Sequence, residues 1–180
     1  MFTRLLLLFT LIITQASCDE PQPTSTSHEY CTVHIVRHGE TDWNAEGKVQ
    51  GHTDTGLNKK GQAQALELKE KLKSITFTGI FSSDLIRARQ TAEIVRNADN
   101  IQIVTSPALR ERNMASCEGK LVKDVRQRYF DDGLLYKPHH EVLSYTFDGI
   151  ETYADTYARI TDFIKAQAVN HIGSTLLVVS

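Results

Sequence analysis

The chain has 180 residues, 41% of them hydrophobic, which is typical of one globular domain with its own core. Its 20 basic and 22 acidic residues give a net charge of −2, which excludes an argument from overall charge for binding nucleic acid or an anionic membrane. Any anion site must therefore be local. The sequence has no internal repeat, no metal-spaced Cys/His cluster and no glycine-rich nucleotide loop.

Residues 1–18 have the pattern of a targeting segment. Arg4 supplies a weak positive charge, and Leu5 to Ile13 supply a mostly apolar run that is too short to span a bilayer. The small residues that follow suit cleavage. The pattern predicts an exported protein, with an uncleaved anchor or a misassigned start codon as the alternatives.

The end of this segment, Ala16-Ser17-Cys18, resembles a bacterial lipobox, in which Cys18 would be lipidated and anchor the chain to a membrane. Gln15 stands where a Leu-like residue is usual, so a periplasmic lipoprotein and a secreted form both stay open. Residues 19–31 contain two prolines and a Ser/Thr cluster, which predicts a flexible tether. If Cys18 is lipidated or removed, Cys31 and Cys117 remain. We expect both as unpaired thiols, because they fall at different ends of the predicted fold.

A β-branched run from Val33 to Val36 ends in Arg37-His38-Gly39, the pattern of a buried strand that leads into a loop. In open α/β sheets ligands bind at that edge. A neighbouring Arg disfavours the imidazolium form of His38, so the ring can act as a nucleophile, and the planar guanidinium suits a phosphoryl group. Gly39 would let the backbone approach that group closely. A surface turn with a solvated Arg is the alternative.

Strand and helix patterns alternate along the rest of the chain, which predicts an α/β fold with a mostly parallel central sheet covered by helices on both faces. A polar loop is expected over Asp42 to Gly56, and an irregular insertion follows a helix near Lys120–Tyr129 and runs to His140. Further strands are predicted at Phe77–Phe81, Ile101–Val104 and Leu176–Val179. Helices are predicted from Asn58 to about Lys73, over Leu85–Val95, near Lys120–Tyr129, and from Glu151 onward.

Three further positions carry specific expectations: the start of the Leu85–Val95 helix, Glu111, and the apolar face of the last helix. Ser83 or Asp84 is expected to cap the Leu85–Val95 helix, and Arg87 in its first turn hints at a bound anion, because a cation there is unfavourable by itself. Glu111 lies between two arginines, which would lower its pKa, whereas burial beside a phosphate would raise it. In the last helix Tyr153, Tyr157 and two isoleucines share a face that we expect to be core.

Together, Arg37-His38-Gly39-Glu40-Thr41, the Ser83–Ala92 segment and Leu109-Arg110-Glu111 resemble the histidine phosphatase superfamily, in its phosphoglycerate mutase-like branch. The resemblance covers residues 32–180. It implies a metal-independent phosphomonoester hydrolase with no cofactor that acts on a small phosphorylated metabolite.

The resemblance also implies roles for individual residues. His38 matches the nucleophile that becomes phosphorylated, and Glu111 matches the proton donor to the leaving oxygen. Arg37 and Arg87 match the arginines that bind the phosphate. Further positions that would line the substrate pocket are Asn44, Gln50 and Gly51.

Two departures from the family pattern matter. Mutases of this branch carry a Tyr where this chain has Met114, and an Arg-Arg pair that is missing here, which favours a phosphatase. In the family the last apolar strand ends in Ser-His-Gly, and this sequence ends at Ser180, so the resemblance predicts a domain lacking its C-terminal end. The alternatives are an inactive truncated phospho-ligand-binding domain and a phosphoglycerate mutase-type phosphotransferase.

Overall fold

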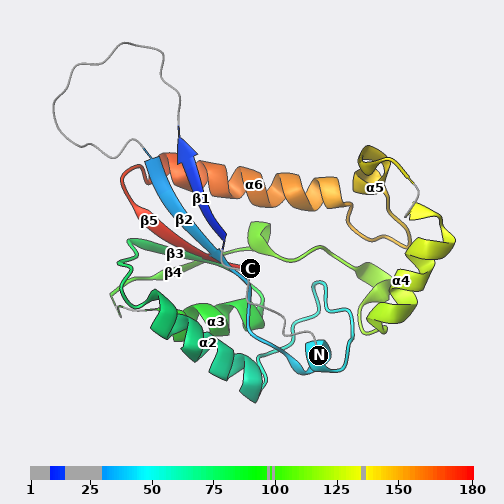
Figure 1. Cartoon of the computed structure of the whole chain (residues 1–180), viewed down its shortest axis with the longest axis horizontal. Coiled ribbons are helices and arrows are strands. Elements are labelled where there is room, and N and C mark those ends of the chain that lie inside the picture. Colours follow the sequence, from blue (N-terminus) through cyan, green and yellow to red (C-terminus); the bar gives the residue numbers. More distant parts are fainter. Residues whose placement is uncertain (1–8, 15–29, 97, 99, 135–136) are drawn as a thin grey trace, which may run out of the picture.

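A computed structural model describes residues 9–14, 30–96, 98, 100–134 and 137–180 of the chain (Figure 1). Most of the predicted targeting segment and tether therefore lies outside the described residues, including Cys18. The rest of the chain forms a sheet with helices packed against it, which confirms the predicted α/β class.

A five-stranded sheet has the order β1-β2-β5-β3-β4, and its last four strands are parallel. The strands are β1 (Phe9–Thr14), β2 (Tyr30–Val36), β3 (Gly79–Ser83), β4 (Ile103–Ser106) and β5 (Thr175–Val179). The mostly parallel sheet was predicted, although β3 and β4 each start and end two residues later than the apolar runs suggest. Polar serines continue both strands to the edge where the site lies.

Strand β1 pairs antiparallel with the outer edge of β2, with Phe9 opposite Ile35 and Thr14 opposite Tyr30. These residues belong to the apolar run of the predicted targeting segment. A run of apolar residues suits both roles, because it can be recognised for export or can cover a strand edge. Targeting stays a prediction.

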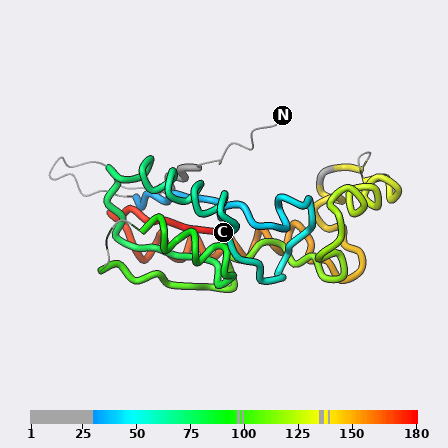
Figure 2. Tube along the Cα trace, turned by 90° about the horizontal axis from the view of Figure 1, so that it is seen from below, coloured from blue at the N-terminus to red at the C-terminus, as the bar shows by residue number. Residues whose placement is uncertain are grey.

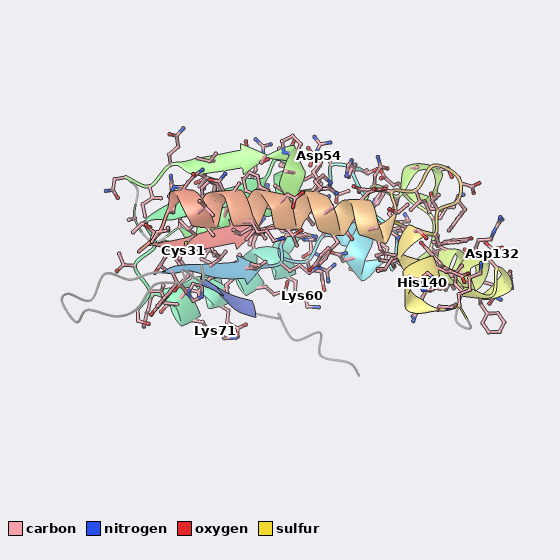
Figure 3. All side chains as sticks on the ribbon, turned by 90° about the horizontal axis from the view of Figure 1, so that it is seen from above. Cys31, Asp54, Lys60, Lys71, Asp132 and His140 are labelled. Carbon is pink, nitrogen blue, oxygen red and sulfur yellow. The ribbon has the colours of Figure 1, made fainter. Side chains whose placement is uncertain are left out.

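Helices cover both faces of the sheet, as predicted: α2 and α3 lie on one face and α6 on the other (Figures 1 and 3). The helices are α1 (Asp42–Ala45), α2 (Lys59–Leu72), α3 (Ile86–Val95), α4 (Val122–Asp131), α5 (His139–Ser144) and α6 (Tyr153–Asn170). Two short 3₁₀ turns are η1 (Pro107–Leu109) and η2 (Ala115–Cys117). None of the helices in the described part of the chain is long and apolar enough to cross a membrane.

Two apolar layers form the core because successive strand residues face opposite sides of the sheet. One layer joins strand residues such as Val36 and Val179 to apolar positions of α2 and α3. The other joins Val33 and Val178 to Ile164 and neighbouring residues of α6. Burial on both faces explains why the strands read as continuous apolar runs.

A separate lobe lies beyond the carboxyl end of the sheet and contains α4 and α5 (Figures 1 and 2). Asp132 and His140 mark its outer end, far from Cys31 at the start of β2 (Figure 3). Its small core includes Cys117, Val125 and Met114. The prediction of an irregular insertion up to His140 was partly wrong, because α5 begins within it.

The predicted core stripe of α6 holds for only part of the helix. Ile164 is buried, whereas Tyr153 and Tyr157 are 45% and 71% exposed. The first turns of α6 extend past the end of the sheet toward the lobe, so no strand lies beneath them (Figure 1). The expectation that both tyrosines are core was wrong for that reason.

The predicted cap of α3 was also wrong. Its N-cap residue is Leu85, whose side chain forms no capping hydrogen bond. The Ser83 hydroxyl accepts from the N–H of Leu85 at 3.3 Å, while Asp54 in the preceding loop accepts from the N–H of Ile86 at 2.6 Å. Asp84 turns away from the helix, so a distant carboxylate takes the place of the local cap.

Cys31 and Cys117 are both buried and unpaired, which confirms the expectation of two free thiols. Burial raises the pKa of the Cys31 thiol. A protonated thiol is a weak nucleophile, so Cys31 behaves as a core residue.

The loop after β2 packs against the first turn of α2 with no room for a side chain between them. A Cβ on Gly39 would lie 2.4 Å from the carbonyl oxygen of Gly61, and one on Gly61 would lie 2.0 Å from the carbonyl oxygen of Glu40. The structure thus gives Gly39 a packing role against α2. The close approach fixes the residue that follows His38.

We expect Gly61→Ala to destabilise the protein by roughly 1–3 kcal/mol, because the added methyl group overlaps backbone atoms. The usual gain from replacing a helical glycine by alanine would be outweighed. Urea unfolding measures the change. Gln62→Ala, an exposed position in the same helical turn, should change the free energy of unfolding by less than about 0.5 kcal/mol. A Gly61→Ala protein as stable as the parent would contradict the packing argument.

Candidate active site

The candidate site lies where β2 and β5 end, at the carboxyl edge of the parallel strands. The backbone N–H of His38 donates to the carbonyl oxygen of Ser180 at 2.9 Å, and the N–H of Ser180 donates to Val36 at 3.1 Å. These two bonds continue the pairing of the strands past their ends. His38 is therefore placed by the sheet itself.

The His38 ring is held in one tautomer. Its Nδ1 lies 2.7 Å from the carbonyl oxygen of Gly39, and because a carbonyl only accepts, Nδ1 must carry the hydrogen. The Nε2 atom then keeps its lone pair. The side chain is buried, with 5% exposure.

Burial lowers the pKa of His38 from 6.5 to about 3, against an opposing effect of the Gly39 hydrogen bond. The charges of Arg87 and Arg37 lower it further. The sequence predicted a neutral ring on account of the neighbouring arginine, and the structure adds burial as the larger cause. A neutral imidazole whose Nε2 carries a lone pair can act as a nucleophile.

Arg87 is 1% exposed and donates four hydrogen bonds. Its Nε lies 3.2 Å from His38 Nε2, and its two terminal nitrogens reach the carbonyl oxygens of Thr53 at 3.0 Å and Gly51 at 2.7 Å. One terminal nitrogen also lies 3.3 Å from Glu111 Oε2. A single buried guanidinium therefore joins three predicted site residues, His38, Gly51 and Glu111.

Glu118, which the sequence did not single out, holds the loop that supplies those carbonyls. Its carboxylate accepts from the backbone N–H groups of His52 at 2.7 Å and Thr53 at 2.8 Å. Gly51 has φ of +56°, and a Cβ there would lie 2.2 Å from Glu118 Oε1. Glycine is therefore required at this position, and Glu118 fixes the loop around Arg87.

Asn44 and Gln50 are held in the same loop by Thr41. The loop expected over Asp42 to Gly56 contains α1. Thr41 caps this helix, and Asn44 Oδ1 accepts a hydrogen bond from the Thr41 N–H at 3.2 Å. Gln50 Oε1 accepts from the hydroxyl of Thr41 at 2.6 Å. Both side chains border the cavity described below, and their hydrogen bonds shape its wall.

Glu111 is separated from the two arginines that flank it in sequence. Arg110 pairs with Asp84 at 2.5 Å and holds the pKa of that carboxyl below its usual range, while Arg112 donates to the hydroxyl of Tyr129. The Glu111 side chain is 45% exposed and its carboxylate pairs with Arg87. It thus faces both the carboxyl edge of the sheet and solvent.

Arg159 of α6 positions the main chain around Glu111, which the sequence did not indicate. Its guanidinium donates to the carbonyl oxygens of Ala108 at 2.9 Å and Arg110 at 2.8 Å and pairs with Glu151 at 2.8 Å. Hydrogen bonds to backbone carbonyls leave no pattern in a sequence. The arrangement ties α6 to the turn that carries Glu111.

A cavity of about 320 Å³ opens beside these residues. Arg37, which is exposed, lines it together with Glu111, Asn44 and Gln50. Arg112, Met114 and residues of α4 form its other side. The cavity therefore runs from two of the predicted catalytic residues, Arg37 and Glu111, to the lobe, whereas His38, Arg87 and Gly51 lie outside its lining.

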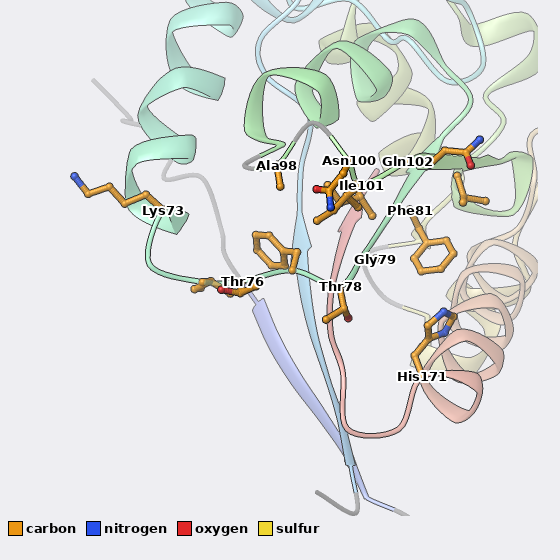
Figure 4. A pocket seen from close by; sticks show the side chains of 14 residues that line it. Lys73, Thr76, Thr78, Gly79, Phe81, Ala98, Asn100, Ile101, Gln102 and His171 are labelled. Carbon is orange, nitrogen blue, oxygen red and sulfur yellow. The ribbon is translucent and has the colours of Figure 1, made fainter.

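A larger cavity, of about 860 Å³, lies at the opposite, amino end of β3 and β4 (Figure 4). Gly79, Ile101 and His171 are among its lining residues. None of the residues predicted for catalysis borders it. The chemistry that the sequence predicts gathers at the carboxyl edge alone.

Comparison with known proteins gives a consistent result. Residues 33–180 match the family model described as "Histidine phosphatase superfamily (branch 1)". The "Probable phosphoglycerate mutase GpmB" of Escherichia fergusonii is 43% identical over 95 residues, which cover 53% of this chain and 44% of that protein. The chain thus spans less than half the length of the curated relatives it matches.

Solved structures share the fold. "Bacillus stearothermophilus YhfR" is 32% identical with a TM-score of 0.70, and the match covers 83% of this chain and 73% of that one. The protein TTHB049 from Thermus thermophilus is 31% identical with a TM-score of 0.62, covering 81% and 75% of the two chains.

The buried neutral state of His38 predicts a dependence of stability on pH. Because the folded pKa is about 3 and the ordinary value is 6.5, the unfolded chain binds more protons between these values, so stability falls as pH drops through this window. From pH 7 to pH 5 the loss due to His38 should be about 2 kcal/mol.

His38→Gln should remove that contribution while leaving the similar effect of buried His34, whose pKa is lowered by burial. Urea unfolding at the two pH values measures both proteins. An identical pH dependence of parent and His38→Gln would contradict the buried neutral ring.

Proposed function

The chain belongs to the histidine phosphatase superfamily, and on that premise we propose that it hydrolyses phosphate monoesters through a phosphohistidine on His38. The observation that carries the proposal is the lone pair of His38 Nε2, which faces the Nε of Arg87 at 3.2 Å. Nucleophile and phosphate-binding cation thus meet at one point. The substrate would be a small phosphorylated metabolite.

Binding is the first step of the proposed reaction. The phosphoryl oxygens would take positions between Arg37 and Arg87, and the bond from Arg87 Nε to Nε2 would be exchanged for a bond to a phosphoryl oxygen. That exchange frees the lone pair when substrate is present. Arg87 is held by main-chain carbonyls, so its charge is positioned before the ligand arrives.

In the second step Nε2 attacks phosphorus, forming a P–N bond as the P–O bond to the alcohol breaks. Glu111 would enter this step protonated, its ion pair with Arg87 given up when the phosphate takes that guanidinium, and would supply the proton that the leaving oxygen needs. The hydrogen on Nδ1 stays with the Gly39 carbonyl. Positive charge around the phosphoryl oxygens supplies most of the stabilisation.

In the third step water attacks the phosphohistidine, breaking the P–N bond and releasing inorganic phosphate. Glu111, deprotonated by the previous step, would accept the proton of that water. His38 and Glu111 then return to their starting states. The residues alone balance the reaction.

Hydrolysis rather than phosphate transfer is favoured by Met114. The family's mutases carry a tyrosine at this position, and Met114 borders the cavity with 9% exposure and no hydroxyl to hold a bound product. A product that is not held leaves, and water then meets the phosphohistidine. We therefore propose a phosphatase.

We expect the purified chain to release phosphate from phenyl phosphate and to form an acid-labile, alkali-stable phosphoprotein. His38→Ala should lower the rate at least about 1000-fold, because it removes the nucleophile. His140→Ala, an exposed histidine of the lobe, is the matched control and should keep the parent's rate.

Equal rates for parent and His38→Ala would overturn the enzymatic proposal. Binding of phenyl phosphate without phosphate release would favour a phospho-ligand-binding domain. Movement of phosphate between positions of phosphoglycerate without its release would favour a phosphotransferase.

We also propose that the chain is exported, on the basis of the apolar run near its N-terminus. In bacterial cells the mature protein should begin near Ser17 or Cys18, as read by mass spectrometry. A lipoprotein would incorporate labelled palmitate in a way that Cys18→Ser abolishes, whereas Gln15→Ala should leave labelling in place. An intact N-terminus with Met1 in all recovered protein would contradict export by cleavage.

A further inference from the structure

Glu111 lies in a segment, residues 110–114, that forms neither helix nor strand. Its side chain is 45% exposed, and its Oε2 forms an ion pair with Arg87 at 3.3 Å. In the proposed reaction this pair is given up, because the substrate phosphate takes the same guanidinium. A proton donor that loses this partner needs another constraint to stay beside the leaving oxygen.

The ring of His52 supplies such a constraint. Its Nε2 lies 2.9 Å from the main-chain carbonyl oxygen of Glu111. Because a carbonyl only accepts, Nε2 carries the hydrogen, and both a neutral ring and an imidazolium can donate it. The bond joins two residues that are 59 positions apart in the sequence. It therefore connects the loop after α1 to the segment of the proton donor.

The loop end of this bond is itself held in place. The backbone N–H of His52 donates to Glu118 at 2.7 Å, and that of Thr53 donates to the same carboxylate at 2.8 Å. The carbonyl oxygens on either side of His52, those of Gly51 and Thr53, accept from Arg87. The ring thus projects from a fixed loop and carries that position to the segment that it contacts.

Arg159 constrains a different part of the same segment. Its guanidinium lies 2.9 Å from the carbonyl oxygen of Ala108 and 2.8 Å from that of Arg110. Its contact with the Glu111 carbonyl is longer, at 3.4 Å. The residues before Glu111 are therefore held by α6, and the main chain of Glu111 itself is held mainly by His52.

We propose that His52 is a positioning residue, which keeps Glu111 beside the leaving oxygen at the step in which the carboxyl leaves Arg87. The inference rests on the proposed function, because it concerns the proton donor of that reaction. In the free protein Glu111 is held through its carboxylate and through its carbonyl. Bound phosphate removes the first of these constraints, and the bond from His52 preserves the second.

Substrates that differ in their need for a proton test this role. The alkoxide of ethyl phosphate must be protonated as it departs, whereas para-nitrophenolate spreads its charge over the ring and leaves without a proton. The ratio kcat/KM reports the steps up to alcohol release, so later hydrolysis of the phosphohistidine does not affect it. We expect His52→Ala to lower kcat/KM about 10-fold or more for ethyl phosphate, but less than about 3-fold for para-nitrophenyl phosphate.

Two amide variants separate the hydrogen bond from the size of the side chain. The amide nitrogen of glutamine takes about the place of Nε2, so His52→Gln should keep both values of kcat/KM within about 3-fold of the parent. His52→Asn carries the same group on a shorter stem, in the place of Nδ1, and should behave like His52→Ala.

His171→Ala is the matched control. The Nδ1 of His171 donates to the carbonyl oxygen of Gln167 at 2.8 Å, and the ring lies at the amino end of the sheet. The variant removes the same type of bond far from the proposed site. It should keep the parent's kcat/KM for both esters.

Hydrogen exchange gives a readout that needs no turnover. With inorganic phosphate bound, exchange over residues 110–114 should be about 10-fold faster or more in His52→Ala than in the parent, because neither constraint on Glu111 is left. Exchange at the parent's rate would contradict the inference. Equal losses for the two esters in His52→Ala, parent values for both, or full activity of His52→Asn would also overturn it.

Failure of this inference is distinct from failure of the proposed function. A chain that hydrolyses both esters without dependence on His52 rejects only the positioning role. A chain that binds phosphate but hydrolyses neither ester rejects the phosphatase, while hydrogen exchange still tests the bond from His52. A chain that binds no phosphate rejects both.

Discussion

The site depends on the hydrogen bonds of one buried cation, the guanidinium of Arg87. Burying a full positive charge is costly unless its hydrogens find acceptors, and here two loop carbonyls, a carboxylate and an imidazole provide them. The same bonds that stabilise the charge also determine where the loop, Glu111 and His38 lie. Stability and positioning are therefore one requirement. A change that loosens the loop would leave the cation without acceptors and also move the residues proposed to react.

The segments around this cation are held by residues far from it in sequence. Glu118 fixes the loop through its backbone N–H groups, Arg159 of α6 fixes the turn carrying Glu111, and the end of β5 fixes His38 through Ser180. Each support comes from a different element. The sheet supplies a rigid edge, and charged side chains fasten the irregular segments to it. This division is common in α/β proteins, where strands set positions and loops carry chemistry.

The sequence predicted the mostly parallel sheet and the helices on both faces, because apolar periodicity is a local pattern. The resemblance of its motifs to the histidine phosphatases, rather than periodicity, predicted the grouping of His38 with Arg87 and Glu111. The sequence did not predict what depends on distant partners. The cap of α3 comes from Asp54, and the first turns of α6 leave the sheet and expose Tyr157. The neutral state of His38 follows mainly from burial, which only the folded chain creates.

The short helix α1 has an optical consequence. It contains Trp43, the single tryptophan of the chain, next to Asn44 in the cavity wall. The indole packs against Gly119, where a Cβ would lie 3.4 Å from the ring. The ammonium group of Lys48 lies over the indole, 5.9 Å from the ring centroid. Emission excited in the tryptophan band therefore comes from one place, beside the cavity, with no other indole to dilute it. Trp43 itself lies outside the cavity lining, but its neighbours Asn44 and Lys48 belong to it, so the indole is a fluorescent probe of the cavity wall.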